Sequence, residues 1–406
     1  MNYNFIIVGA GAAGLYCGVE LLKRKPSPSV CILESYKKVG GRVSTHRDKQ
    51  HGVQYQWENG AGRVSESHLL VKDLMKRYDL HKAPIGNGST NWYDGPNPFF
   101  SLIPTYLAPL LALPEATLKQ TTVAKLLEDI HGPAKAKEFC LLFPYWAEMQ
   151  VLRADLALQG FLNTFGGKEE FFVITEGFQA ITDGLAKEFK ELGGIIQVNS
   201  EVLDIKETRT GVEVQLKDGS LDGDKCILAL PAYALKALPS IEPKMPILKH
   251  LIMCPLLRIY AVFPVHKGHS WFSDLPSTVV HNELRYIIPV NSAKGIIMIS
   301  YTDGEDAYEW IQILNKKGIK EVQKRIMSLI RHTFPHRAIP EPHQFKAYPW
   351  MHGCTYWTSG KYDPIAMLEK SHQVSPKIFA CGESLSLKQA WVESALESAT
   401  NLLAKL

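Results

Sequence analysis

The chain has 406 residues, of which 46% are hydrophobic and 21% charged, an ordinary balance for a globular protein with its own core. This length is enough for two or three domains. A formal net charge of +4 is too small, for a chain of this size, to predict binding to nucleic acid or to an anionic membrane. No apolar run is long enough to span a bilayer, and the seven cysteines lack CxxC spacing, so the sequence predicts no metal site and a reducing compartment.

The first residues follow the pattern of a dinucleotide-binding unit. The apolar run over 5–8 predicts a strand that is buried on both faces, and a G-x-G-x-x-G motif occupies 9–14. Residues 15–25 predict a helix, and a second strand over 30–33 ends in Glu34, twenty residues past Gly14. Strand, glycine turn, helix, strand and acid therefore come in the order that dinucleotide binding requires.

Each residue of this motif has a physical role. Gly9 makes the tight turn, Gly11 lets the backbone approach a pyrophosphate, and Gly14, after Ala13, lets helix and strand pack closely. The helix N-terminus offers free N–H groups and a partial positive charge to the phosphates. Glu34 can accept hydrogen bonds from ribose hydroxyls, although these residues alone leave the identity of the dinucleotide open.

The remaining chain alternates between the nucleotide domain and a second region. A helix and three strands follow residue 168, and the tail contains a strand, a turn and a long helix. We expect an α/β fold in which a discontinuous Rossmann-type domain is joined to a second, α+β substrate domain. The predicted limits are 1–70, 168–240 and 345–406 for the nucleotide domain, and 71–167 and 241–344 for the substrate domain.

Four motifs resemble those of the flavin-containing amine oxidases, the family of monoamine, polyamine and L-amino acid oxidases. The first is "ESYKKVGGRVSTHR", in which Gly40, Gly41 and Arg42 follow the acid of the second strand. The resemblance implies that the glycines admit the phosphates of FAD and that Arg42 pairs with them by a forked contact. Because NAD-binding units do not need this second phosphate motif, the predicted cofactor is FAD.

The second motif is "GAGRVSESH". The resemblance implies that Gly60 and Ala61 let the backbone pass close to the flavin ring. Arg63 stands where L-amino acid oxidases of this family carry the arginine that binds the substrate carboxylate, although Gly62 and Ser65 depart from their pattern. Two roles for Arg63 stay open, namely binding a carboxylate, or capping a helix or contacting phosphate.

The third motif is the tail, "IFACGESLSLKQAWVESALESA". The resemblance implies that Gly382 and Glu383 meet the pyrophosphate and the ribityl chain. The helix that begins near Trp391 would aim its N-terminal amides, including that of Val392, at the flavin pyrimidine ring. The resemblance also places Val202 among the cofactor-binding residues.

The fourth motif is "YWTSGKYDP". Lys361 stands where monoamine oxidases carry the cysteine that bonds to the flavin, so FAD is predicted to bind without a covalent bond. Tyr362 and Trp391 resemble the two walls of the family's aromatic cage, which guides an amine to the flavin. The alternative is that both are core aromatics.

One departure concerns oxygen. In "CPLLRIYAVF", Arg258 replaces the lysine that usually holds a water at the flavin and assists the reaction with oxygen. Arginine cannot act as a proton acceptor and is bulkier, so the speed of reoxidation by O2 is in doubt.

The predicted protein is an enzyme, a flavin amine oxidase closest to L-amino acid oxidase-like members around Arg63. It would oxidise a C–N bond of a small amine or L-amino acid by hydride transfer to flavin N5, and the imine would hydrolyse while O2 becomes H2O2. The alternatives are a related flavin desaturase or isomerase acting on an apolar substrate, and a flavin-binding interaction protein with little turnover.

The predicted partners are therefore the substrate and O2, without nucleic acid or a membrane span, and a homodimer is one option for the assembly. The predicted compartment is the cytoplasm. The alternative is the peroxisome, because Ala404-Lys405-Leu406 resembles a peroxisomal C-terminal signal.

Overall fold

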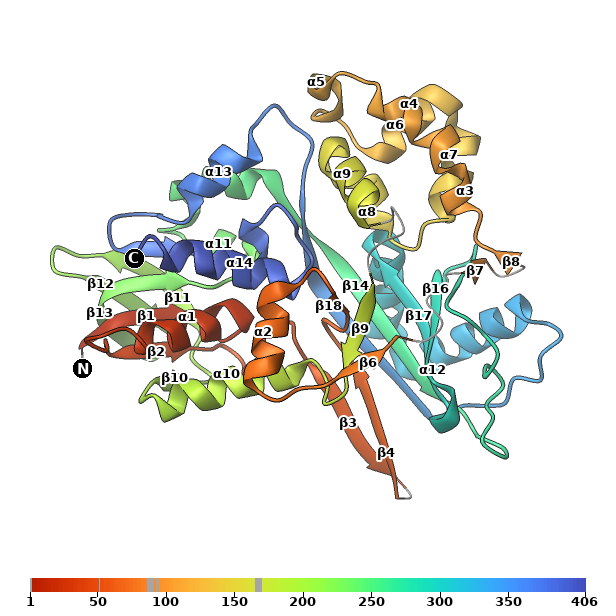
Figure 1. The fold of residues 1–406 in the computed structure, drawn as a ribbon, viewed down its shortest axis with the longest axis horizontal. Coiled ribbons are helices and arrows are strands. Elements are labelled where there is room, and N and C mark those ends of the chain that lie inside the picture. Colours follow the sequence, from red (N-terminus) through yellow and green to blue (C-terminus); the bar gives the residue numbers. More distant parts are fainter. Residues whose placement is uncertain (1, 51, 86–90, 93–94, 165–169) are drawn as a thin grey trace.

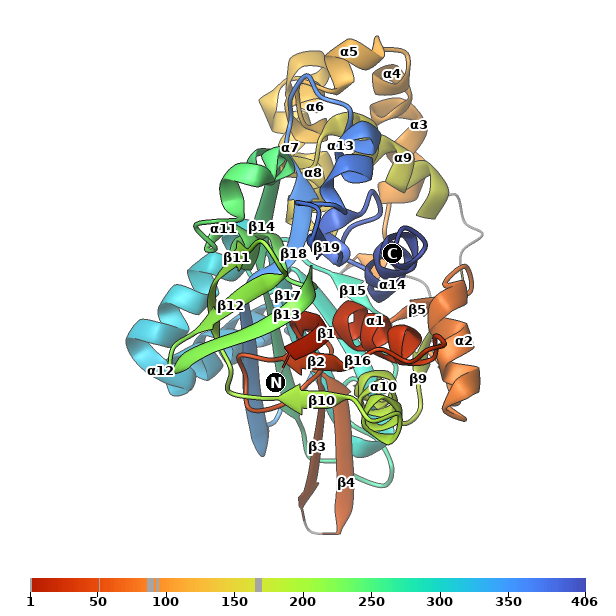
Figure 2. The ribbon, with the colours of Figure 1, turned by 90° about the vertical axis from the view of Figure 1, so that its left-hand side faces the viewer.

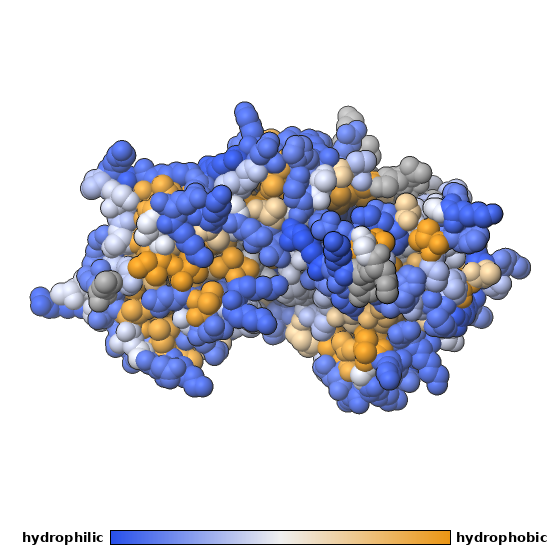
Figure 3. Space-filling model, turned by 90° about the horizontal axis from the view of Figure 1, so that it is seen from below, coloured by the Kyte–Doolittle hydropathy of each residue, from blue (hydrophilic) through white to orange (hydrophobic). Residues whose placement is uncertain are grey.

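A computed structural model describes residues 2–50, 52–85, 91–92, 95–164 and 170–406. Two large β-sheets with their covering helices dominate it, one on the left of Figure 1 and one on its right. The described part of the chain contains no helix that is both long and apolar enough to cross a membrane. Hydrophilic side chains cover much of the face seen from below, with several apolar patches between them (Figure 3).

The first sheet combines strands from the beginning, the middle and the end of the chain. Its order is β10-β2-β1-β13-β12-β11, with β19 also paired to β13. The bounds are β1 Asn2–Val8, β2 Val30–Leu33, β10 Ile195–Gln197, β11 Val202–Glu207, β12 Val212–Leu216, β13 Gly219–Leu228 and β19 Ile378–Ala380. β1 pairs in parallel with both β2 and β13, and its last residues are buried on both faces, as the apolar run predicts.

Helices cover both faces of this sheet. On one face, α1 (Ala12–Leu22) packs between α10 (Gln179–Glu191) and α14 (Val392–Leu403), and α2 (Leu69–Arg77) packs on α14. Leu15, Phe189 and Leu396 are fully buried in the core that these helices share. The other face carries α11 (Ala232–Lys236), the short 3-10 helices η1 (Glu242–Lys244) and η2 (Pro246–His250), and α13 (Pro364–Ser371). The nucleotide turn thus lies at the carboxyl ends of buried parallel strands.

The second sheet has the order β18-β14-β17-β16-β15-β7-β8. Its bounds are β7 Asn91–Trp92, β8 Gly95–Pro96, β14 Leu251–Val262, β15 Thr278–Val279, β16 Tyr286–Asn291, β17 Ile296–Asp303 and β18 Gln344–Trp357, with the 3-10 helix η3 (Ser292–Lys294) between β16 and β17. The long helix α12 (Gly304–Thr333) covers one face and is broken at Gly318.

A helical region stands above this sheet in Figure 2. It comprises α3 Phe99–Tyr106, α4 Ala108–Leu111, α5 Glu115–Leu118, α6 Val123–His131, α7 Pro133–Leu141, α8 Trp146–Gln150 and α9 Ala154–Thr164. Its helices share a core of their own, to which Phe99, Phe139 and Phe143 contribute. Buried Asp303, at the end of β17, accepts hydrogen bonds from the amides of Trp146 (2.7 Å) and Ala147 (2.8 Å) and so fixes the start of α8.

Two small sheets complete the structure. The hairpin β3 (Thr45–Gln50) and β4 (Val53–Glu58) projects at the bottom of Figure 1, and β5 (Val64–Ser65), β9 (Phe171–Ile174) and β6 (Lys82–Pro84) pair in the order β5-β9-β6. The 3-10 helix η4 (Glu383–Leu385) follows β19. Together these segments lie between the two large sheets.

The fold is α/β with a Rossmann-like unit, as predicted. One segment sits differently from the expected domain limits, because β18 pairs with β14 in the second sheet, whereas residues 345–357 were expected in the nucleotide domain. The boundary expected at 167/168 lies outside the described residues. The two-domain division otherwise stays a prediction.

Candidate active site

The turn between β1 and α1 needs two of its glycines for packing. A Cβ on Gly14 would lie 2.0 Å from Gly9 O, and one on Gly9, where φ is +102°, would lie 2.6 Å from Ala229 O. Gly11 differs, because a Cβ there would meet no protein atom within 4 Å. Gly11, the third residue of the motif, therefore borders open space at the N-terminus of α1.

A second glycine turn lies beside the first. Gly40 N donates to Ala10 O (2.9 Å), and a Cβ on Gly41 would lie 3.4 Å from the Cα of Gly11. No side chain caps the N-terminus of α1, and its first turn contains no acid. Free amides, open space and two glycine turns together fit the pyrophosphate of a dinucleotide such as FAD.

Glu34 lies at the end of β2 and is 5% exposed. Its carboxylate accepts hydrogen bonds from Ala10 N (2.8 Å) and Tyr36 N (2.9 Å), which holds it at the nucleotide turn. Ser200 N donates to Glu34 O, which brings the start of β11, with Val202, close to the same strand end. Glu34, predicted to bind ribose hydroxyls, and Val202, predicted to bind the cofactor, thus lie on segments that are hydrogen-bonded to each other.

Arg42 and Glu383 join the first and last parts of the chain. Their ion pair is 2.9 Å long, and Arg42 Nη1 also donates to Gly353 O (3.0 Å). Glu383 accepts further hydrogen bonds from Thr355 N, Thr355 Oγ1 and Ala390 N. Glu383 is therefore a buried organiser of this junction, while Gly382, with φ of +132°, makes the turn before it.

The segment after β4 approaches Arg42 closely. A Cβ on Gly60 would lie 1.9 Å from Arg42 O, and Ala61 N donates to the same oxygen (3.1 Å). The glycine is thus needed for packing of one backbone on another. This contact carries the chain to Arg63.

Arg63 enters a pocket of aromatic rings. Its Nη2 donates to Tyr145 Oη (2.6 Å), and its guanidinium lies 5.5 Å from the ring centre of Phe171 and 6.0 Å from that of Trp391. Among the residues the structure describes, Tyr145 Oη is its one hydrogen-bond acceptor, and no acidic side chain lies within ion-pair distance of it. A guanidinium stays charged here, so this cation has unused donors.

The start of α14 lies at the same place. Trp391 is the N-cap residue of α14 and Val392 its first residue, and no side chain caps this end. The Trp391 ring stacks on Phe171 (5.8 Å between ring centres) and meets His68 edge-on (4.9 Å). Free helix amides and the Arg63 cation therefore face one region, which favours an anionic group there.

Arg258 projects from β14 toward the same segment. Its Nη1 donates to Glu58 O (3.1 Å), and its guanidinium lies 5.0 Å from the ring centre of Tyr301. A Cβ on Gly62 would lie 3.2 Å from Nη1, so the glycine that departs from the family pattern makes room for this arginine. Arg258 Nε is buried without a hydrogen-bond partner.

Tyr362 and Trp391, the expected aromatic pair, have different ring neighbours in the structure. Tyr362 packs on His250 (3.9 Å between ring centres) and under the Arg153 guanidinium (4.6 Å), and no ring contact in the described part of the chain joins it to Trp391. Its hydroxyl donates to Thr358 O. Tyr362 is partly buried, and the ring stacked on Trp391 is that of Phe171, so the aromatic pair stays a prediction.

The next feature is the fourth motif and the strand β18 that precedes it. Lys361 is exposed and lies beyond β18. The residues of β18 that reach Arg42 and Glu383 are Gly353 and Thr355, with Cys354 between them. Burial, followed by the nearby Glu383 carboxylate, raises the pKa of the Cys354 thiol to about 12.

Sequence reasoning missed the residues that α8 and its neighbours bring to Arg63. Tyr145 is the N-cap residue of α8, Glu148 is in its first turn, and Tyr301 comes from β17. No motif marks them. The sole signal is a tyrosine and a glutamate three residues apart at a helix start after Pro144, which places them on one side of the helix.

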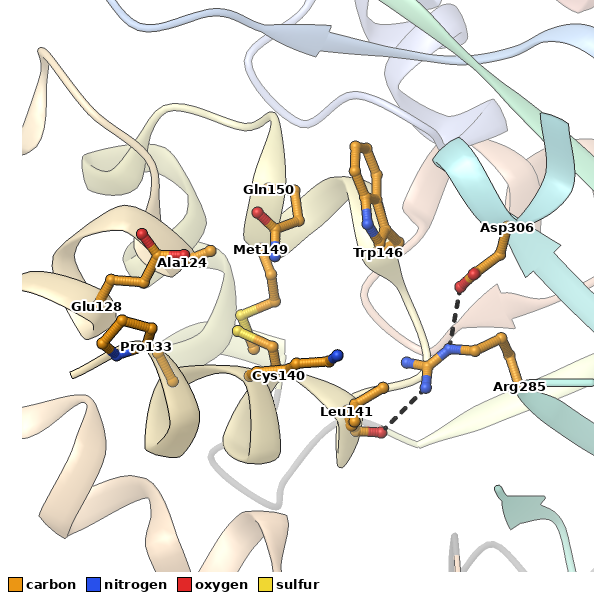
Figure 4. Close-up of a pocket in the computed structure, with 12 residues that line it drawn as sticks. Ala124, Glu128, Pro133, Cys140, Leu141, Trp146, Met149, Gln150, Arg285 and Asp306 are labelled. Carbon is orange, nitrogen blue, oxygen red and sulfur yellow. Dashed lines mark hydrogen bonds and ion pairs between the residues drawn. The ribbon is translucent and has the colours of Figure 1, made fainter. Parts of the chain in front are cut away.

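A different side of α8 lines a separate hollow of about 400 Å³ (Figure 4). Trp146, Met149 and Gln150 form one wall, and Arg285 pairs there with Asp306 (3.3 Å). Arg285 also donates to Phe143 O (2.8 Å) and so ties the helical region to the second sheet. None of the residues predicted from the sequence lines this hollow.

Comparisons with known proteins agree with this geometry. Residues 132–402 match the family model of flavin containing amine oxidoreductases, and residues 7–78 match that of the NAD(P)-binding Rossmann-like domain. An L-amino-acid oxidase of Trimeresurus stejnegeri is 23% identical over 97% of this chain and 85% of its own length. One of Siganus canaliculatus is 22% identical over 98% of this chain and 84% of its own. A redesigned putrescine oxidase shares the fold, with a TM-score of 0.73 at 17% identity over 100% of this chain and 99% of that one.

Proposed function

The chain belongs to the flavin-containing amine oxidoreductases, and from this premise we propose that it oxidises small L-amino acids with a non-covalently bound FAD. When bound, the flavin supplies the two-electron acceptor for the hydride that leaves the substrate α-carbon. The imine product hydrolyses to a 2-oxo acid and ammonia, and O2 becomes H2O2. The L-amino-acid oxidases that match over nearly the whole chain support this choice of substrate.

The observation that carries the proposal is the unsatisfied guanidinium of Arg63. Arg63 is half-buried, and among the described residues Tyr145 Oη is the one acceptor of its hydrogen bonds. A substrate carboxylate fits the free side of this fork and would hold the amino acid in one orientation. Phe171 and Trp391 flank the same place with apolar faces that exclude water. A desaturase of apolar substrates would not need this cation.

The cofactor would be held by residues at both ends of the chain. Gly11 and the amides of α1 suit the pyrophosphate, with Gly40, Gly41 and Arg42 beside them. The uncapped start of α14 at Val392 would stabilise negative charge on the reduced ring.

The substitution Arg63→Ala tests the substrate class. We expect kcat/KM for L-phenylalanine to fall by the equivalent of about 2–5 kcal/mol, because the carboxylate loses its buried partner. 2-Phenylethylamine, which has no carboxylate, should lose little. Stopped-flow flavin reduction under anaerobic conditions gives both values.

Arg325→Ala is the matched control, since Arg325 is exposed on α12 and pairs with Glu321 there. Arg63→Lys should recover only part of the loss, because an ammonium lacks the planar fork. Equal losses for the amino acid and the amine, at normal flavin content, would contradict the carboxylate role.

Non-covalent binding is supported by Cys354 rather than by Lys361. With a pKa of about 12, the Cys354 thiol stays protonated and is a poor nucleophile. We expect acid precipitation to leave all yellow colour in the supernatant. Flavin that stays with the pellet, and no longer does so after Cys354→Ala, would overturn this part of the proposal.

The assembly and the compartment remain predictions. A homodimer is measured by light scattering. For the compartment, the cytoplasm stays the prediction and the peroxisome the alternative. Lys405 Nζ donates to Glu369 O, and Leu406 packs on the core of the first domain. Microscopy of the protein carrying an N-terminal fluorescent tag distinguishes the two compartments.

A further inference from the structure

Glu148 is an acid that Arg63 influences electrostatically, and neither the fold nor the proposed function has given it a role. It lies in the first turn of α8, three residues after Tyr145, the residue that accepts the hydrogen bond from Arg63. Within the described residues, its carboxylate has no hydrogen-bond or ion-pair partner. Asp303, the other acid at this helix start, is fully used by the amides of Trp146 and Ala147.

The groups that face Glu148 come from several elements. Arg63 follows β4, Asp303 ends β17, and the phenols of Tyr145 and Tyr356 complete the charged and titratable surroundings. Burial raises the pKa of Glu148 to about 7, the Asp303 carboxylate adds to the rise, and Arg63 opposes it. Glu148 is thus ionised at pH 8 and is poised to accept a proton.

Charges on the other neighbouring helices are satisfied elsewhere. On α12, Asp306 pairs with Arg285 (3.3 Å), and on α9, Asp155 pairs with Arg153 (2.7 Å). The acids of α6 are exposed. The charge balance near the substrate therefore rests on the cations Arg63 and Arg258 and on Glu148, with Asp303 behind them.

We propose that Glu148 accepts the ammonium proton of a zwitterionic amino acid when the substrate carboxylate binds Arg63. An N–H bond of the ammonium breaks, its electron pair stays on nitrogen, and the proton forms an O–H bond with the Glu148 carboxylate. The products are a neutral bound amine and a neutral carboxylic acid, so charge and atoms balance. This inference rests on the proposed function.

Electrostatics drives the transfer in this direction. A bound carboxylate cancels the Arg63 charge, and with it the interaction that stabilises ionised Glu148, so the pKa of Glu148 rises further. Partial burial of the bound substrate lowers the pKa of its ammonium, because burial disfavours the charged form. Hydride loss needs the free electron pair on nitrogen, so the chain delivers the reactive form of the substrate at neutral pH.

Benzoate, a carboxylate without an amine, isolates the proton step from turnover. At pH 8, calorimetry in two buffers with different ionisation enthalpies should show uptake of up to one proton per benzoate bound. Glu148→Gln should bind benzoate with almost no proton uptake, and its affinity should no longer fall as the pH rises above 7. Glu138→Gln, which changes an exposed acid on α7, should behave like the unmodified protein.

Kinetics supplies the second measurement. At pH 7, Glu148→Gln should lose at least about tenfold in kcat/KM for L-phenylalanine. The loss should shrink as the pH approaches about 10, where the free amine is already present in solution. Glu148→Asp, which keeps a carboxylate, should retain the proton uptake. This variant tests the inference if Glu148→Gln fails to fold.

The outcomes separate this inference from the proposed function. If benzoate binding depends on Arg63 but proton uptake is the same in the unmodified protein and in Glu148→Gln, this inference is wrong and the proposed function stands. Activity loss at every pH without the alkaline recovery would assign Glu148 to holding the substrate rather than to proton transfer, and would also overturn it. Benzoate binding that does not depend on Arg63 would contradict both proposals.

Discussion

Arg258 is held on two sides by the protein. Glu58 O accepts from its Nη1, and the ring of Tyr301 lies against its guanidinium. A guanidinium fixed in this way has less freedom to organise a water molecule than a shorter, strongly hydrated ammonium. We therefore expect this residue to influence the reaction of the reduced flavin with oxygen rather than the binding of the substrate.

Arg258→Lys should accelerate reoxidation of the reduced protein by O2 by about tenfold, which corresponds to ~1.4 kcal/mol in activation free energy. The rate of anaerobic flavin reduction should change little, because Arg63 and Trp391 are left intact. Stopped-flow mixing of reduced protein with oxygenated buffer gives the first rate. A lysine variant that reoxidises no faster would show that Arg258 does not limit this step.

At the level of single residues, the glycines were predictable because each role follows from local geometry. Gly14 and Gly9 are excluded from carrying a side chain by atoms less than 3 Å away, and Gly11 by the ligand it is expected to face. Tyr145 and Glu148 were not predictable. Tyr145 meets Arg63 across 82 residues of sequence, and no local pattern encodes that contact.

Among the elements, strands that are buried on both faces were the easiest to predict. β2 spans Val30–Leu33, the expected bounds, because a continuous apolar run suits a central parallel strand. The expected domain limits placed residues 345–357 in the nucleotide domain, whereas β18 pairs with β14 in the second sheet. Its burial alternates irregularly over 14 residues, and its partner β14 is identified by register rather than by composition.

The helix α8 is an element that the sequence could not predict. It has only five residues, and a helix this short owes its stability to tertiary contacts. Asp303 supplies them by accepting from two amides at its start. Sequence could indicate a helical region over 105–165, but not that one short helix within it would bring Tyr145 to Arg63.

For the whole molecule, Asp303 joins the helical region to the second sheet and so sets the position of Tyr145 and Glu148. Asp303→Asn should lower the free energy of unfolding of this region by about 2–3 kcal/mol, because two charge-assisted hydrogen bonds are weakened. It should also raise KM for amino acids more than it lowers kcat.

Thermal unfolding followed by tryptophan fluorescence measures the stability. Asp129→Asn, at an exposed ion pair with Lys125, is the control and should leave the melting temperature unchanged. A variant at Asp303 with unchanged melting temperature and KM would show that α8 is positioned by other contacts.

β13 lies at the centre of the nucleotide domain, where it pairs with β1, β12 and β19. Its partners are separated from it by up to about two hundred residues, so this sheet closes late. During synthesis, the apolar runs of β1 and β2 leave the ribosome long before β13 and β19 can cover them. Chaperones are thus expected to shield the nascent amino terminus, and flavin is expected to be captured only after translation of α14.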